Sequence, residues 1–146
     1  MKRINPSLET TVNVLIYTLW GECRGESFQG KRGVASVIWN RALKEIKKNS
    51  IGMIDALKQV CLAPHQFSCW NDDNASLQQE VDQSSDAWYD IMAIVTDMVS
   101  TVTLENGSFK PIFDATFYHA TSCHPYWADE FIEVEQIGNH IFYKEK

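Results

Sequence analysis

The sequence lacks a long hydrophobic run and is poor in positive charge. Its 146 residues include 13 Lys and Arg against 19 Asp and Glu, which gives a formal net charge of −6. Proteins that bind nucleic acid generally need a basic surface to displace phosphate counterions, so we expect no nucleic-acid partner. No stretch approaches the ~18 consecutive apolar residues of a membrane-spanning helix, so we expect no membrane partner either.

The N-terminal region lacks the apolar segment of a secretory signal peptide. Residues 1–7 are basic at their start, but the apolar positions of residues 8–20 are interrupted by polar ones such as Glu9 and Asn13. A signal peptide needs an apolar stretch of about 7–15 residues behind its basic start. We therefore expect synthesis in the cytoplasm, so that any action outside it depends on release by another agent.

A cysteine spacing typical of structural zinc sites is also missing. The cysteines are Cys23, Cys61, Cys69 and Cys123, and no two of them form a Cys-x-x-Cys pair. The histidines near Cys123 match no familiar zinc spacing. We therefore expect no metal and no cofactor, and cytoplasmic synthesis favours free thiols over disulfides.

Apolar residues do recur at helical spacing through the first two thirds of the chain. They predict helices over residues 7–20, 29–48, 51–61 and 76–103. Ser50 is expected as the N-cap of the third helix, and residues 63–75 as a loop.

The last third of the chain has a different pattern. Residues 116–119 are typical of a short strand, and residues 131–136 and 140–143 flank Gly138-Asn139, a two-residue hairpin signal. Helices followed by a small antiparallel sheet give a mostly helical α+β fold. We expect one domain over residues 1–146, with the sheet near the C-terminus.

Glu22 is the first candidate for catalysis. It follows Gly21, where the first helix is expected to stop, so it should lie at the negative end of that helix dipole. The dipole and the neighbouring Trp20 both disfavour a charged carboxylate, and a general acid for glycosidic cleavage has to be protonated. By this pattern alone a solvated residue at a helix end is the commoner interpretation. Glu26, expected on the following loop, is the alternative acid.

Four segments of the chain follow one another in an order typical of one enzyme family. They are Leu19–Glu26 with Val34–Arg41 behind it, Gln66–Trp70, Ala115–His119 with Pro125–Ala128 behind it, and Ile137–Tyr143. Together they resemble the SleB/CwlJ cell wall hydrolases, whose pattern is Gly-Glu-Ala-Arg-Gly-Glu and then an apolar helix ending in Asn-Arg. Here Cys23 replaces the common Ala, and Cys123 and His124 lie where the family more often has apolar residues or Asn.

This resemblance implies a lysozyme-like domain that cleaves peptidoglycan between N-acetylmuramic acid and N-acetylglucosamine. The catalytic acid of the family falls on Glu22, and other motif residues are expected to line the substrate groove. The substrate-binding candidates are Glu26, Gln66, Phe67, Ser68, Trp70, Tyr118, His119, Trp127 and His140. For Phe67 and Trp70, packing in the core is an equal alternative to substrate binding. For His119 and His140, a purely structural role is the alternative. Tyr118 is expected to contact Glu22 or the substrate.

Other residues of the motifs are expected to act indirectly. Asn40 and Arg41, on the buried side of a helix, are expected to fix the loop that carries Glu22. Arg24 is expected to pair with Glu26 or to meet a carboxylate of a peptide stem.

The matched segments contain no obvious second catalytic acid. Asp72 and Asp73, which follow Trp70, are the best candidates, but they fall in a loop that is expected to be solvated. Ordinary glycosidases use two carboxylates, whereas a lytic transglycosylase manages with one because the 6-hydroxyl of the sugar attacks. We therefore expect a lytic transglycosylase, with a hydrolytic muramidase and a non-catalytic glycan-binding module as alternatives. The biological role expected is that of a monomeric phage endolysin acting on peptidoglycan after release by a holin, with spore germination as the alternative.

Overall fold

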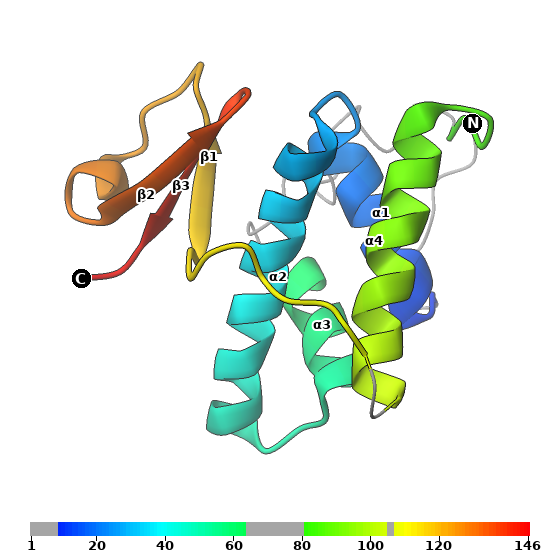
Figure 1. Ribbon diagram of the computed structural model, residues 1–146. Coiled ribbons are helices and arrows are strands. Elements are labelled where there is room, and N and C mark those ends of the chain that lie inside the picture. Colours follow the sequence, from blue (N-terminus) through cyan, green and yellow to red (C-terminus); the bar gives the residue numbers. More distant parts are fainter. Residues whose placement is uncertain (1–8, 64–80, 105–106) are drawn as a thin grey trace.

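The structure, a computed structural model, describes residues 9–63, 81–104 and 107–146 (Figure 1). Its elements are α1 (Thr11–Cys23), α2 (Phe28–Asn49), α3 (Met53–Leu62), α4 (Asp86–Thr103), β1 (Phe117–Ala120), the short 3-10 helix η4 (Tyr126–Asp129), β2 (Ile132–Ile137) and β3 (His140–Lys144). The mostly helical α+β prediction is confirmed. Among these described elements, none is a helix long and apolar enough to cross a membrane.

Side-chain caps set three of the helix starts. Thr10, Ser27 and Ser85 each accept a hydrogen bond from a backbone N–H in the first turn of α1, α2 and α4 respectively. The prediction that Ser50 caps α3 is wrong. Ser50 instead ends α2 in the left-handed conformation (φ 55°), where its N–H donates to the Ile46 carbonyl. Gly52 occupies the N-cap position of α3, which therefore begins without a side-chain cap.

Two helix boundaries differ from the predicted ones for local reasons. Helix α1 does not stop at Gly21 but continues to Cys23, because burial of Trp20 and Cys23 outweighs the roughly 1 kcal/mol that glycine costs a helix. Helix α4 does not include residues 81–85. The Asp82 carboxylate accepts hydrogen bonds from the N–H and hydroxyl of Ser84, and this turn holds the chain out of the helix until Ser85 caps it.

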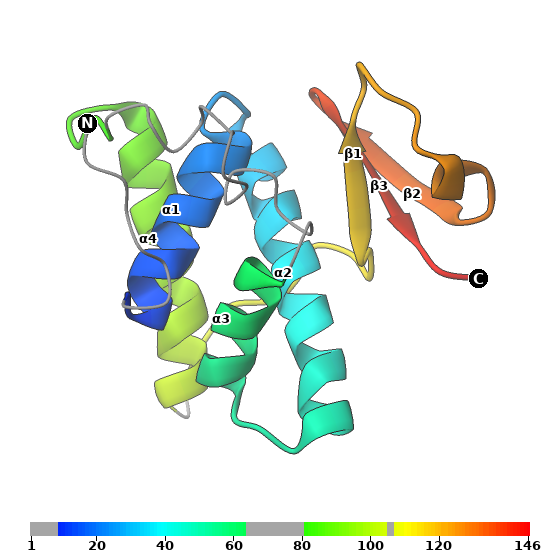
Figure 2. The same ribbon diagram turned by 180° about the vertical axis from the view of Figure 1, so that it is seen from behind.

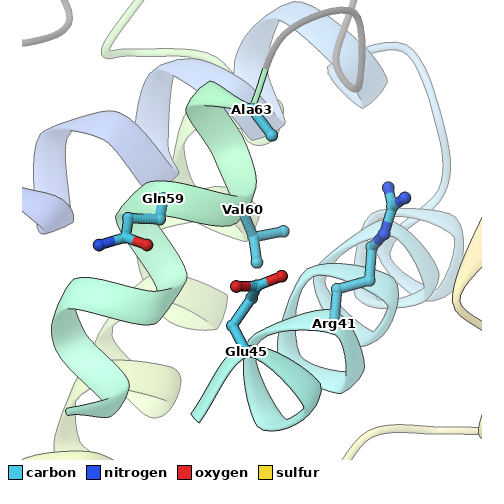
Figure 3. Close-up of a pocket in the computed structure, with 5 residues that line it drawn as sticks. All are labelled: Arg41, Glu45, Gln59, Val60 and Ala63. Atoms are coloured by element: carbon cyan, nitrogen blue, oxygen red, sulfur yellow. The ribbon is translucent and has the colours of Figure 1, made fainter. Parts of the chain in front are cut away.

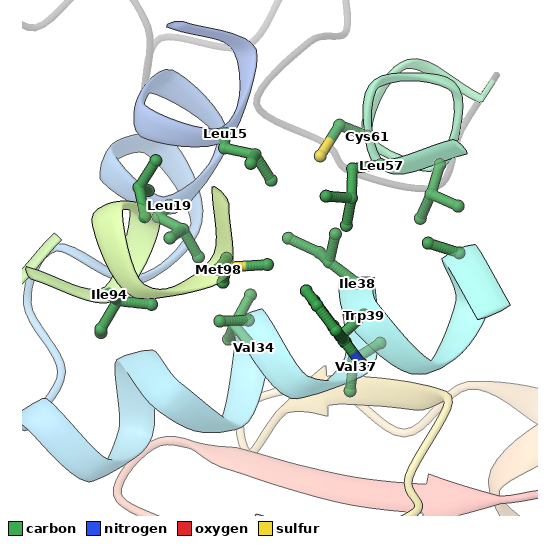
Figure 4. Packing of buried hydrophobic residues seen from close by; sticks show 14 of the residues in the cluster. Leu15, Leu19, Val34, Val37, Ile38, Trp39, Leu57, Cys61, Ile94 and Met98 are labelled. Carbon is green, nitrogen blue, oxygen red and sulfur yellow. The ribbon is translucent and has the colours of Figure 1, made fainter. Parts of the chain in front are cut away.

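The four helices bury one apolar core. Leu15 and Leu19 of α1, Ile38 of α2, Leu57 of α3 and Met98 of α4 meet in it, and each of these side chains is fully buried (Figure 4). Helix α2 has the central place, since both views show it between the sheet and the other helices (Figures 1 and 2).

The three strands form an antiparallel sheet in the order β1-β3-β2. The predicted hairpin is confirmed: Gly138, with φ 56°, and Asn139 connect β2 to β3. Side chains alternate between the two faces of the sheet. One face lies on α2, where a Cβ atom on Gly33 would come within 2.7 Å of the Phe142 ring, so only glycine allows this close approach.

Candidate active site

Glu22 and Tyr118 form the centre of the candidate site. Glu22 lies in the last turn of α1, and Tyr118 lies on β1, 96 residues later. The Tyr118 hydroxyl donates a hydrogen bond of 2.5 Å to Glu22 Oε1, and both side chains are half-buried. Of the two contacts expected for Tyr118, the structure therefore shows the one with Glu22. A hydroxyl that donates to a carboxylate stabilises its charged form.

His140, a predicted substrate-binding residue, packs beside this pair. Its ring centroid lies 4.8 Å from that of Tyr118, and the residue is only 8% exposed. Its buried Nδ1 has no hydrogen-bond partner within the described parts of the chain. Burial lowers the pKa of His140, while the negative charges of Glu26 and Glu22 oppose that shift. The imidazole is therefore favoured in its neutral form next to the acid.

Glu26 lies on the loop between α1 and α2, as predicted, and faces the hairpin turn. Its Oε1 accepts a hydrogen bond from the Asn139 backbone N–H at 2.8 Å, and its Oε2 accepts one from Asn139 Nδ2 at 3.2 Å. A Cβ atom on Gly138 would lie 2.6 Å from the same carboxylate. Both oxygens of Glu26 are thus occupied in fastening the hairpin, and its predicted contact with substrate stays a prediction.

A buried lysine fixes the other side of this loop. Lys31, whose side chain is 4% exposed, donates to the Glu26 carbonyl oxygen at 2.5 Å and to Asp90 Oδ2 at 3.2 Å. It thereby connects the loop to α2 and α4. Lys31 is not among the residues predicted for the site, although a lysine placed three residues before Val34 and seven before Ile38 falls on the buried stripe of its helix.

Asn40 and Arg41 fix β1 and not the loop of Glu22, so that expectation is corrected. Asn40 Nδ2 donates to the carbonyl oxygens of Phe113 and Ala115, both at 2.9 Å, just before the strand begins. The Arg41 guanidinium lies 4.7 Å from the centre of the Phe117 ring. These contacts position Tyr118 against α1, because Tyr118 follows Phe117 on the same short strand.

Arg24 ends α1. Its Nη1 donates to the Trp20 carbonyl oxygen at 3.0 Å, and its guanidinium lies 5.8 Å from the centre of the Trp20 ring. Both contacts are within the helix end that carries Glu22, so Arg24 supports the geometry of that last turn.

Two predicted substrate-binding residues lie on the other face of the sheet. His119 Nδ1 donates to the Ala120 carbonyl oxygen at 2.8 Å, which leaves Nε2 to accept from the Tyr143 hydroxyl at 3.0 Å. Trp127 of η4 packs against Phe117 and Tyr143 in the same aromatic cluster. The structure does not bring His119 and Trp127 to Glu22, and their role in binding stays a prediction.

Several predicted residues lie outside the described part of the chain. They are Gln66, Phe67, Ser68 and Trp70, and Cys69 lies there as well. Of the described cysteines, Cys23 and Cys61 are buried and free, and Cys123 is exposed and free. Burial raises the pKa of Cys61 to about 12, which disfavours a reactive thiolate. Within the described ranges, no group of three or more His, Cys, Asp or Glu residues is arranged to hold a metal ion.

Comparison with known proteins gives a family match. The sequence model of the Cell Wall Hydrolase family matches residues 25–143, which is most of the chain. The matched region includes Glu26, Tyr118 and His140, and it begins three residues after Glu22. No curated protein and no solved structure matches the chain.

Proposed function

Because the chain belongs to the Cell Wall Hydrolase family, whose members act on peptidoglycan, we propose that it cleaves the glycan strand with Glu22 as the acid. The bond we propose is the one between N-acetylmuramic acid and N-acetylglucosamine. The observation that supports this most directly is the hydrogen bond of 2.5 Å from the Tyr118 hydroxyl to Glu22 Oε1. It holds one carboxyl group in a half-buried position at the junction of helices and sheet.

In the first step Glu22 donates its proton to the glycosidic oxygen. The bond from the muramic acid C1 to that oxygen breaks, and the glucosamine part leaves as an alcohol. Glu22 becomes a carboxylate as the proton departs, and the Tyr118 hydroxyl stabilises the charge that forms on Oε1. A fixed hydrogen-bond donor next to a charge that develops in the transition state lowers the activation barrier of the cleavage step.

In the second step the same carboxylate acts as a base. It takes the proton of the 6-hydroxyl of the muramic acid, and the oxygen of that hydroxyl bonds to C1. The product ends in a 1,6-anhydro ring, Glu22 is protonated again, and no water is consumed. We therefore propose a lytic transglycosylase.

Within the described residues, the contacts of Glu26 support a single acid, while Asp72 and Asp73 lie outside them. Glu26 lies four residues after Glu22, and both of its carboxylate oxygens accept hydrogen bonds from Asn139. A carboxylate held in this way is a poor candidate for the second group that two-carboxylate glycosidases require. The runner-up is a hydrolytic muramidase, in which Glu22 activates a water molecule in place of the 6-hydroxyl.

Analysis of the ends of digested glycan tests the mechanism. Peptidoglycan digested with the protein is reduced with borohydride and analysed by mass spectrometry. Transglycosylation leaves anhydro ends that borohydride does not reduce, whereas hydrolysis leaves reducing ends that become muramitol. Anhydro ends alone are expected, and reducing ends in their place would contradict the transglycosylase and favour the muramidase.

For the biological role we propose a phage endolysin. In this proposal the protein is a monomer that is made in the cytoplasm and reaches the wall once a holin opens the inner membrane. Its net charge of −6 gives no attraction to polyanionic walls, which favours a thin wall with little anionic polymer. Expression in a bacterium with and without a holin gene tests this. Lysis is expected only with the holin, and lysis at the same rate without it would contradict the role.

A further inference from the structure

A second site lies between α2 and α3. It is a cavity of about 280 Å³ lined by Arg41 and Glu45 of α2 and by Gln59, Val60 and Ala63 at the end of α3 (Figure 3). Pockets for whole small molecules begin at roughly 300 Å³, so this cavity has the size for one amino-acid-like group and not for a glycan chain.

The Arg41 side chain lines this cavity, where the charges of Glu145 and Glu45 stabilise its guanidinium without a direct ion pair. Its guanidinium is half-buried and stacks over the Phe117 ring at 4.7 Å. Within the described residues it donates no hydrogen bond and forms no ion pair. Charged side chains that are removed from water usually form an ion pair. A guanidinium that stacks on an aromatic ring can still donate hydrogen bonds from its edge to a planar anion.

The nearby acids form no direct ion pair with the guanidinium. Glu45 lies one helical turn after Arg41, but its Oε2 accepts a hydrogen bond of 2.6 Å from Asn49 Nδ2. Figure 3 shows the Arg41 guanidinium directed away from the Glu45 carboxylate. The cavity is thus lined by a guanidinium that has no direct ion pair in the described part of the chain, by the amide-bearing Gln59, and by the apolar side chains of Val60 and Ala63.

Arg41 also connects the cavity to the strand of the candidate active site. Its guanidinium lies 4.7 Å from the centre of the Phe117 ring on β1, and Tyr118, the next residue of that strand, donates to Glu22. A group bound to Arg41 would therefore lie near the strand that carries Tyr118.

We propose that Arg41 binds a carboxylate of the peptide stem that N-acetylmuramic acid carries, so that the enzyme prefers glycan with stems to glycan without them. This inference rests on the proposed function. A carboxylate is the anion that fits a guanidinium bidentately, the Gln59 amide suits a peptide bond, and Val60 and Ala63 suit a small apolar side chain. The sugar backbone itself offers no such group except the lactyl carboxylate, which is blocked while the stem is attached.

The test compares two substrates. Sacculi are used intact or after an amidase has removed their stems, which exposes the lactyl carboxylates, and the rate on the first is divided by the rate on the second. This preference is expected to fall about tenfold in Arg41→Met, the loss expected for one charge-assisted hydrogen bond. The control Lys44→Met removes a positive charge from the exposed side of the same helix and is expected to keep the wild-type preference.

The peptides that the amidase releases provide a second measurement. They are expected to inhibit the wild-type enzyme on intact sacculi, and Glu45→Gln, which removes a nearby negative charge, is expected to make that inhibition stronger. If Arg41→Met lowers both rates equally, or if the peptides do not inhibit, the stem site is wrong. If the wild-type protein cleaves neither substrate, the proposed function itself has failed, so the two failures are distinguishable.

Discussion

Glu26 and Asn139 lie 113 residues apart in the chain, yet both oxygens of the Glu26 carboxylate accept hydrogen bonds from Asn139. This contact fastens the tip of the β2–β3 hairpin to the loop that follows α1. Glu26 is four residues beyond Glu22, and the same hairpin carries His140. The geometry at Glu22 therefore depends on a contact outside the reacting groups.

Glu26→Ala is expected to destabilise the protein through loss of this contact. Both hydrogen bonds disappear. Because the hairpin tip is already exposed to solvent, the loss is limited, and we expect the free energy of unfolding to fall by roughly 1–2 kcal/mol. Asn139→Ala removes only the side-chain bond and should cost less. Urea denaturation measures both, with Glu135→Ala on the exposed side of β2 as the control. Equal effects of Glu26→Ala and Glu135→Ala would contradict a fastening role.

Glu22→Gln is expected to abolish lysis while glycan binding survives. Glutamine keeps the size of the side chain but carries no acidic proton, and loss of a general acid lowers a rate about a hundredfold or more. Loss of turbidity of cells stripped of their outer membrane measures the rate, and pelleting with glycan measures binding. A variant that lyses cells at the wild-type rate shows that Glu22 is not the acid. A variant that still binds while it cannot cleave also rules out the glycan-binding module for the wild-type protein.

Tyr118→Phe is expected to lower kcat about tenfold with little change in KM. The substitution removes the hydroxyl that donates to Glu22 Oε1 but leaves the ring packed against His140 and Phe142. Tyr143→Phe is the matched control, because it removes a hydroxyl from the opposite face of the sheet, where the partner is His119. Steady-state kinetics on soluble glycan fragments would separate the two. An equal loss of kcat in both variants would mean that only the stability of the sheet is affected.

His140 is expected to make the fold sensitive to mild acid. Burial lowers its pKa below the ordinary value of 6.5, so in the window below that value the unfolded chain binds a proton that the folded protein excludes. The stability from this group is complete above pH 6.5 and is lost as the pH falls through the folded pKa. Urea unfolding between pH 7.5 and pH 5 should show a steeper loss in the wild-type protein than in His140→Gln. Parallel curves for the two proteins would show that His140 is not responsible.

Local patterns predicted the elements of the fold well. The four helices and the Gly138-Asn139 hairpin follow from spacing and turn chemistry within a few neighbouring residues, and each exists in the structure. The errors are local as well. Serine is a common N-cap residue, but Ser50 lies at the end of α2, where the backbone adopts the left-handed conformation. Asp82 and Ser84 form a turn that apolar periodicity cannot detect.

The candidate site was predicted only in part, because its contacts join distant segments. The resemblance to a family indicated Glu22 as the acid and Tyr118 as a residue that contacts either Glu22 or the substrate. The structure shows the contact with Glu22. No pattern in the sequence indicates that Glu26 meets Asn139 or that Asn40 holds the chain before β1. Successive side chains of a strand point to opposite faces of the sheet, which explains why His119 is separated from Tyr118 although the two are neighbours in β1.

The strand order β1-β3-β2 has a consequence for how the site comes into being. Strands β2 and β3 are joined by a two-residue turn and can pair quickly, whereas β1 pairs with β3 only after a loop of many residues has closed. We therefore expect Tyr118 to reach Glu22 late in folding, after the hairpin has formed. A chain with its helices already formed would carry Glu22 in place, but that carboxyl group would acquire its hydroxyl donor only when β1 has paired with β3.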